Sequence, residues 1–71
     1  MNTNWFEVWT DDGLSVPYVL LVMSDAERQN FVVIDSKENN KVVFRSANYN
    51  TAKLWLLEDE YKLVEGRMNL E

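Results

Sequence analysis

The feature of this sequence that most constrains its fold is a single change of hydrophobic period near residue 46. Up to Arg45, apolar and β-branched residues come in short runs of strand length, separated by turn residues. After Ser46 most residues are good helix formers, and the apolar ones recur at helical spacing. One such change of period predicts an α+β fold. The 71 residues, 46% of them hydrophobic, suit one small folded domain that spans positions 1–71.

Four strands are predicted in the first part of the chain. They cover residues 4–10, 18–23, 31–35 and 41–45, with polar or turn-forming residues between them. Asn39 and Asn40 suit the left-handed backbone of a hairpin turn. Pro17 stands just before the second strand, where its missing N–H costs no ladder bond. We expect an antiparallel β-meander of about four strands. A closed small barrel with a helix at its end is the alternative.

One helix is predicted to follow the strands and to end near Glu60. Asn48 or Asn50 can cap its start by accepting hydrogen bonds from the first free amides. At about 100° per residue, four apolar residues share one sector of about 60°, which is the predicted core face. These residues are Tyr49, Ala52, Leu56 and Leu63. Trp55 lies beside this sector, and Leu63-Val64 predicts either a short fifth strand or a frayed end. The expected fold therefore ends in one C-terminal α-helix packed on one face of the sheet.

Charge and residue inventory argue against several functional classes. Seven basic residues stand against twelve acidic ones, and the bases are scattered, so we expect no nucleic acid among the partners. The longest apolar run, Tyr18–Met23, is far shorter than the roughly 20 residues of a membrane-spanning helix, so we expect no membrane insertion. Cys and His are both absent, which removes thiolate ligands and the commonest catalytic base. We therefore expect no catalytic residues, no metal and no cofactor.

The chain ends carry little information. The first four residues have no basic region followed by a long apolar core, so we do not expect a signal peptide. This favours a cytoplasm-like compartment. Residues 70–71 could derive from an expression tag and are given no functional weight.

Trp5 and Trp9 are the first candidates for a partner-binding surface. They share one face of the first predicted strand with Glu7, while Phe6 and Val8 occupy the other face. A single helix covers one side of a sheet only. If Phe6 and Val8 face the helix, the two tryptophans point outward as an aromatic stripe bordered by charges, which is typical of a binding surface. The alternative is that they form a second minor core or line a barrel.

Glu58, Asp59 and Glu60 are the second candidates. They lie at the predicted C-terminal end of the helix, where the helix dipole disfavours negative charge. Residues that cost local stability can mark a contact with a basic partner. The alternative is a solvated helix end whose charges are screened by salt. The acidic pair before Gly13 predicts a turn, because calcium-loop spacing is missing.

Several segments resemble a family of short uncharacterised proteins from cyanobacteria. These segments are Trp5–Trp9, Asp12–Leu14, Pro17–Leu21, Glu38–Asn40, Lys53–Tyr61 and Val64–Arg67. Together they cover most of the chain. The resemblance implies a soluble protein of a photosynthetic bacterium, and it carries no activity or site.

The sequence thus predicts a non-enzymatic small protein-interaction module, an accessory or regulatory subunit of a larger complex. It would bind through Trp5 and Trp9, through the Glu58–Glu60 corner, or through both. A homodimer that buries the aromatic face against itself is also compatible with the sequence. The rival hypothesis is a small-molecule-binding domain, or a minor enzyme, with a pocket between helix and sheet.

Overall fold

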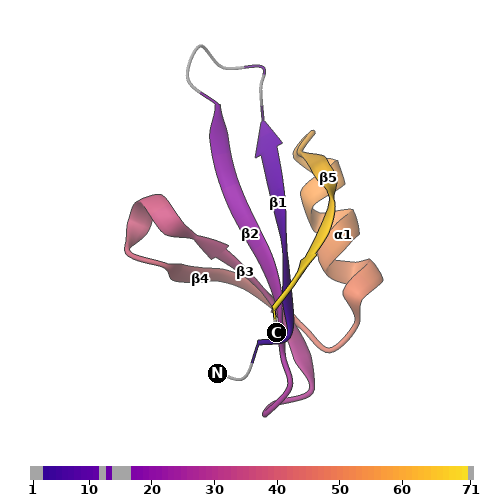
Figure 1. The fold of residues 1–71 in the computed structure, drawn as a ribbon. Coiled ribbons are helices and arrows are strands. Elements are labelled where there is room, and N and C mark those ends of the chain that lie inside the picture. The colour runs from indigo at the N-terminus through magenta and orange to yellow at the C-terminus, as the bar shows by residue number, and fades with distance from the viewer. Residues whose placement is uncertain (1–2, 12, 14–16, 71) are drawn as a thin grey trace.

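The computed structural model describes residues 3–11, 13 and 17–70. Within these ranges the chain forms five strands, one α-helix and one short 3-10 helix (Figure 1). In chain order these are β1 (Trp5–Asp11), β2 (Tyr18–Asp25), β3 (Asn30–Asp35), η1 (Ser36–Glu38), β4 (Lys41–Ser46), α1 (Tyr49–Glu58) and β5 (Lys62–Asn69). The predicted α+β fold class is confirmed. The predicted C-terminal position of the helix needs a correction, because α1 lies between β4 and β5.

All five strands belong to one antiparallel sheet in the order β4-β3-β2-β1-β5. The first four strands form the predicted meander. Residues 63–64, which the sequence left open as a strand or a frayed end, lie in β5, and this strand pairs with β1. Because β4 and β5 are the two edges, α1 carries the chain across one face of the sheet (Figure 1). We call this the helix side and the opposite surface the helix-free face.

Both ends of α1 have identifiable caps. Asn48 is the N-cap, and its side-chain oxygen accepts hydrogen bonds from the backbone amides of residues 50 and 51, at 2.8 and 3.3 Å. At the other end the Tyr61 amide donates to the Leu56 carbonyl, and the Glu60 amide donates to the Leu57 carbonyl, both at 3.0 Å. This is the Schellman arrangement, and it places Glu60 in the left-handed region at φ 63°. Among the described residues, no helix is long and apolar enough to cross a membrane.

The core lies between α1 and the helix side of the sheet. Its buried hydrophobic residues are Trp9, Leu20, Val22, Val33, Ala52 and Leu56. The predicted core face of the helix is right for Ala52 and Leu56, and Tyr49 and Trp55 pack partly buried against the same cluster. It is wrong for Leu63, which lies in β5 and is 38% exposed, because the helix ends before this residue. The aromatic rings of Trp55 and Phe44 stack at 4.8 Å and extend the core over β4.

Two backbone irregularities shape the β3–β4 hairpin. Asn39 and Asn40 have φ angles of 60° and 59°, as the sequence predicts for left-handed residues. A bulge in β4 pairs Phe44 with Val33 but Val42 with Ile34. Val42 and Phe44, which strict alternation would put on one face, therefore lie on opposite faces. Phe44 joins the core, and Val42 is left on the helix-free face.

Candidate functional site

The tryptophans of β1 lie on the helix side, opposite to the prediction. Trp9 is 1% exposed and belongs to the core, and Trp5 packs partly buried against it. Phe6 and Val8 point to the helix-free face instead, because neighbouring side chains of a strand alternate. The expected outward-facing Trp5/Trp9 stripe is therefore wrong. The larger aromatic pair gains more from burial than Phe6 and Val8 would, so it takes the covered side of the sheet.

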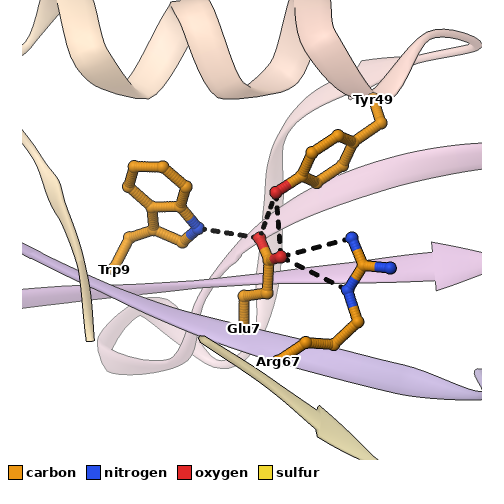
Figure 2. Close-up of polar contacts among 4 residues, drawn as sticks. All are labelled: Glu7, Trp9, Tyr49 and Arg67. Carbon is orange, nitrogen blue, oxygen red and sulfur yellow. Dashed lines mark hydrogen bonds and ion pairs between the residues drawn. The ribbon is translucent and has the colours of Figure 1, made fainter. Parts of the chain in front are cut away.

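Glu7 lies between the two tryptophans and brings a carboxylate into this core, with only 3% of its surface exposed. Figure 2 shows three donors that surround it. The Trp9 indole N–H donates at 3.1 Å, and the Tyr49 hydroxyl lies 2.8 Å from each carboxylate oxygen. The Nε and a terminal nitrogen of Arg67 both lie 3.3 Å from Oε2. The group therefore ties β1, α1 and β5 together through one buried charge.

The guanidinium of Arg67 is also held by aromatic rings. Its central carbon lies 3.7 Å from the ring centre of Trp5 and 5.2 Å from that of Tyr49, within the range of cation–π attraction. Trp5, Tyr49 and Phe31 form a cluster of three rings whose centres are 5.8 to 6.0 Å apart. The arrangement leaves no oxygen of Glu7 without a donor. We therefore assign the Glu7 network a structural role.

Sequence reasoning did not identify Glu7 or Arg67 as partners. The usable signal was the spacing Trp5-x-Glu7-x-Trp9, which puts a carboxylate beside two indole donors on one strand face. Arg67 is 60 positions away in the chain, so only the β1–β5 pairing brings it in. The burial of Tyr49 raises the pKa of its hydroxyl, and its hydrogen bond to the Glu7 carboxylate raises it further.

A second buried carboxylate belongs to Asp35, at the end of β3. Asp35 is 5% exposed, and it accepts hydrogen bonds from the Tyr18 hydroxyl and, at 3.0 Å, from the Lys37 amide. The bond to Asp35 is the main reason that the pKa of Tyr18 rises to about 12. The Lys37 amine lies 5.4 Å from the centre of the Tyr18 ring. These contacts hold the start of η1 against β2, and each carboxylate oxygen of Asp35 accepts a hydrogen bond.

The predicted acidic corner, Glu58, Asp59 and Glu60, is exposed at the C-terminal end of α1. Beside it an open depression is lined by Asp11, Gly13, Glu60 and Lys62. Within residues 3–11, 13 and 17–70, no three Asp, Glu, His or Cys side chains come together in a way that could hold a metal ion. The three residues are neighbours in the chain, and their side chains are exposed to solvent. A role for this corner in binding a partner stays a prediction.

The helix-free face is an apolar surface that α1, the one α-helix among the described residues, does not cover. The pairing register places alternate residues of all five strands on it. Its apolar members are Phe6, Val8, Val19, Leu21, Met23, Val32, Ile34, Val42, Val64 and Met68. Val32 and Ile34 are buried in its middle, whereas Val19, Val42, Val64 and Met68 are 37 to 56% exposed. The centre of the face is thus inaccessible to solvent, and apolar side chains around it are exposed.

Charge is sparse on this face, although the chain has a net charge of −5. Among the residues that the register assigns to it, Asp25 is the only acidic one, and it is 3% exposed. Arg45 lies 3.1 Å from Asp25 and 2.9 Å from the Asn30 side-chain oxygen. Burial alone would raise the pKa of Asp25, but the hydrogen bond from Arg45, with smaller contributions from Arg28, lowers it below its usual value. Arg45 therefore pairs with Oδ2 of Asp25, whereas the buried Oδ1 has no hydrogen-bond partner within the described part of the chain. Lys62 lies apart from both residues at the outer end of β5.

Both edges of the sheet carry features that discourage pairing with a further strand. β4 has a bulge at Val43 and carries Lys41 and Arg45, and β5 has an irregularity at Glu65-Gly66. Bulges and edge charges are the usual protection against edge-to-edge association. The uncovered face, rather than either edge, is therefore the surface suited to association.

No protein-family model matches the sequence, and the searches of curated proteins and of solved structures found no significant match. The resemblance to cyanobacterial proteins therefore stays a prediction.

Proposed function

We propose that the protein is a small non-enzymatic interaction module that binds an apolar protein surface through its helix-free face. It would act as an accessory or regulatory subunit in a cytoplasm-like compartment. The observation that carries the proposal is the apolar rim of this face, where Val64 and Met68 are 43% and 56% exposed. The Trp5/Trp9 stripe is no longer part of the proposal, because Trp9 has almost no accessible surface.

The composition of the face supports a protein partner. Interface centres are depleted in charge and rich in apolar side chains, and this face combines both features around the buried pair Val32 and Ile34. Contiguous exposed apolar patches on small proteins mark sites of interaction more often than chance. The rival hypothesis of a pocket between helix and sheet has less support, because Trp9 and Leu56 fill that space with 1% and 0% exposure.

Site-specific photo-crosslinking tests the proposal in cells that produce the protein. A photoreactive amino acid at position 64 or 42 samples the helix-free face, and the same residue at position 54 is the matched control. Leu54 is 58% exposed on α1 and therefore at least as open to solvent. We expect discrete protein adducts from positions 64 and 42 and none from position 54. The absence of adducts from both face positions, or equal adducts from position 54, would refute the assignment.

A further inference from the structure

We propose that the outer edge of β1 is a binding site for an extended strand of a partner protein. In the closed chain β5 occupies this edge, and it has to leave before the partner strand can pair (Figure 1). The partner strand that fits is uninterrupted and carries an arginine opposite Glu7. We call the outer edge of β1 the acceptor edge. It is a second surface, separate from the helix-free face, so this inference goes beyond the proposed function.

Burial shows that β5 is held weakly. None of its eight residues is buried, whereas four of the six residues of β3 are. Within the described part of the chain β5 pairs with β1 alone. The other edge strand, β4, also lacks a buried residue, but Phe44 stacks on Trp55 and holds that strand to the core. Segments with few buried apolar contacts open at low free energy, so β5 should leave the sheet more readily than the other strands.

The backbone of β5 also fits the acceptor edge imperfectly. Val8 pairs with Val64 and the adjacent Glu7 with Arg67, so Glu65-Gly66 has no partner on β1. Glu65 has a left-handed φ of 57°, which is unfavourable for a residue other than glycine. The pairing of β1 with β2, in contrast, runs without a shift from Phe6 to Asp11. The irregularity that protects this edge therefore belongs to β5, and β1 presents a regular edge once β5 has left.

Glu7 specifies which strand the acceptor edge selects. Its carboxylate is buried, and Arg67 supplies the cation beside it at 3.3 Å. The Arg67 side chain is 41% exposed, so it can withdraw into solvent with β5. Glu7 then keeps the donors Trp9 and Tyr49 but loses its counter-charge, which is costly for a buried carboxylate. A strand that returns a guanidinium to this place, flat against Trp5 as Arg67 is at 3.7 Å, removes that cost.

The point at which β5 separates can be placed after Tyr61. The Tyr61 amide donates to the Leu56 carbonyl at 3.0 Å, and the Tyr61 ring packs partly buried against the core. β5 begins at the next residue. The helix cap and the core can therefore stay intact while β5 moves.

Native-state hydrogen exchange on the full chain tests whether β5 leaves by itself. At urea concentrations below the unfolding transition, the amides of β5 should exchange with little urea dependence, and those of β3 with the steep dependence of global unfolding. Val33→Ala, at a residue with 0% exposure, should accelerate exchange in β3 and change β5 less than about twofold, because it destabilises the closed and open forms equally. The same urea dependence in β5 and β3 would show that β5 leaves only on global unfolding, and the proposal would be wrong.

Fluorescence anisotropy of a labelled synthetic peptide tests the acceptor edge. The peptide has the sequence of residues 61–70 without Glu65 and Gly66, which makes the strand uninterrupted and keeps Arg67 opposite Glu7. We expect it to bind the full chain, and its Arg67→Met version to bind at least about tenfold more weakly. A peptide in which Val64 and Arg67 exchange places is the matched control. It keeps charge and composition but turns the guanidinium to the opposite face, so it should bind as weakly as the Met version.

Two chain variants complete the experiment. Arg67→Met weakens the hold of β5 and should tighten binding of the uninterrupted peptide, because a larger fraction of the chain is open. With Glu7→Gln the Arg and Met peptides should bind within about twofold of each other, because no buried charge remains to be compensated. Equal binding of all three peptides to the wild-type chain would overturn the proposal, as would no binding to either the wild-type or the Arg67→Met chain up to about 1 mM. Exchange of β5 between two copies, without peptide binding, would make a second copy the occupant and reject the partner strand.

Discussion

Replacing Arg67 by Met removes the guanidinium that accompanies the buried carboxylate of Glu7. Breaking a fully buried ion pair costs about 3–5 kcal/mol. Arg67 is 41% exposed on its side chain, so water can enter the gap and the cost is lower. A hydrogen bond to a charged group contributes about 1.5–3 kcal/mol, and an exposed cation–π contact such as that with Trp5 adds about 0.5–1 kcal/mol. We expect Arg67→Met to lower the free energy of unfolding by about 2–3 kcal/mol.

Urea unfolding followed by tryptophan fluorescence measures this loss. A domain of this length has a stability of roughly 4–10 kcal/mol, so the variant should still fold. Its melting temperature should fall by about 10–20 °C. The partner variant Glu7→Gln removes the charge and keeps a carbonyl acceptor for Trp9 and Tyr49. In that background Arg67→Met should cost only about 1 kcal/mol, which gives a coupling of about 1–2 kcal/mol.

Two outcomes of this double-mutant cycle would refute the idea that Arg67 compensates the buried carboxylate of Glu7. If Arg67→Met costs the same in the wild-type chain and in the Glu7→Gln background, the guanidinium does not compensate the buried carboxylate. A cost below about 0.5 kcal/mol in the wild-type background would place Arg67 among ordinary surface residues. Either result would mean that Glu7 is stabilised by Trp9 and Tyr49 alone.

Three further predictions concern the core, the helix end and the tyrosines. Trp9→Ala should cost about 3–5 kcal/mol in urea unfolding, whereas Leu54→Ala, at an exposed position, should cost under about 0.5 kcal/mol; equal losses would contradict the burial of Trp9. Glu60→Gly should raise the free energy of unfolding by about 0.5–1 kcal/mol, because glycine adopts the left-handed φ of 63° without strain. Glu58→Gly, within the helix, should lower it by about 1 kcal/mol, and a loss at both positions would argue against the Schellman cap. The pKa of Tyr18 is raised to about 12, so the folded state favours the protonated phenol over the phenolate. The stabilisation that Tyr18 gives is therefore present below about pH 10 and is lost as the pH rises toward 12. Urea midpoints measured across this pH range should fall less steeply for Tyr18→Phe than for the wild-type chain. Identical slopes would show that Tyr18 does not cause the pH dependence.

Much of the secondary structure could be predicted from local sequence, because local chemistry decides it. The strands at 18–23, 31–35 and 41–45 lie within β2, β3 and β4, and their β-branched and aromatic residues are the cause. Asn48 could be identified as a candidate helix cap from its side chain alone. Asn39 and Asn40 could be placed in a left-handed turn because few other residues adopt it.

The direction in which β1 faces could not be decided from the sequence. Both of its faces are apolar: one carries Trp5 and Trp9, the other Phe6 and Val8. Alternation fixes which residues share a face and says nothing about which face the helix covers. The prediction that the tryptophans face solvent rested on the assumption that Phe6 and Val8 lie under the helix. It failed because Trp9 lies in the core and the Glu7 carboxylate beside it is compensated by Arg67 of the last strand.

The sequence by itself therefore predicted the α+β class, favoured a meander over a small barrel and narrowed the helix cap to Asn48 or Asn50, since each depends on residues that are neighbours in the chain. Only the tertiary structure decided that β5 pairs with β1, that Arg67 reaches Glu7 across 60 positions, and that the uncovered face is the one with Phe6 and Val64. These outcomes depend on which distant segments compete for one sheet edge and one covered face. That competition is settled by total buried area and by the pairing of a single buried charge, and no local pattern records either quantity.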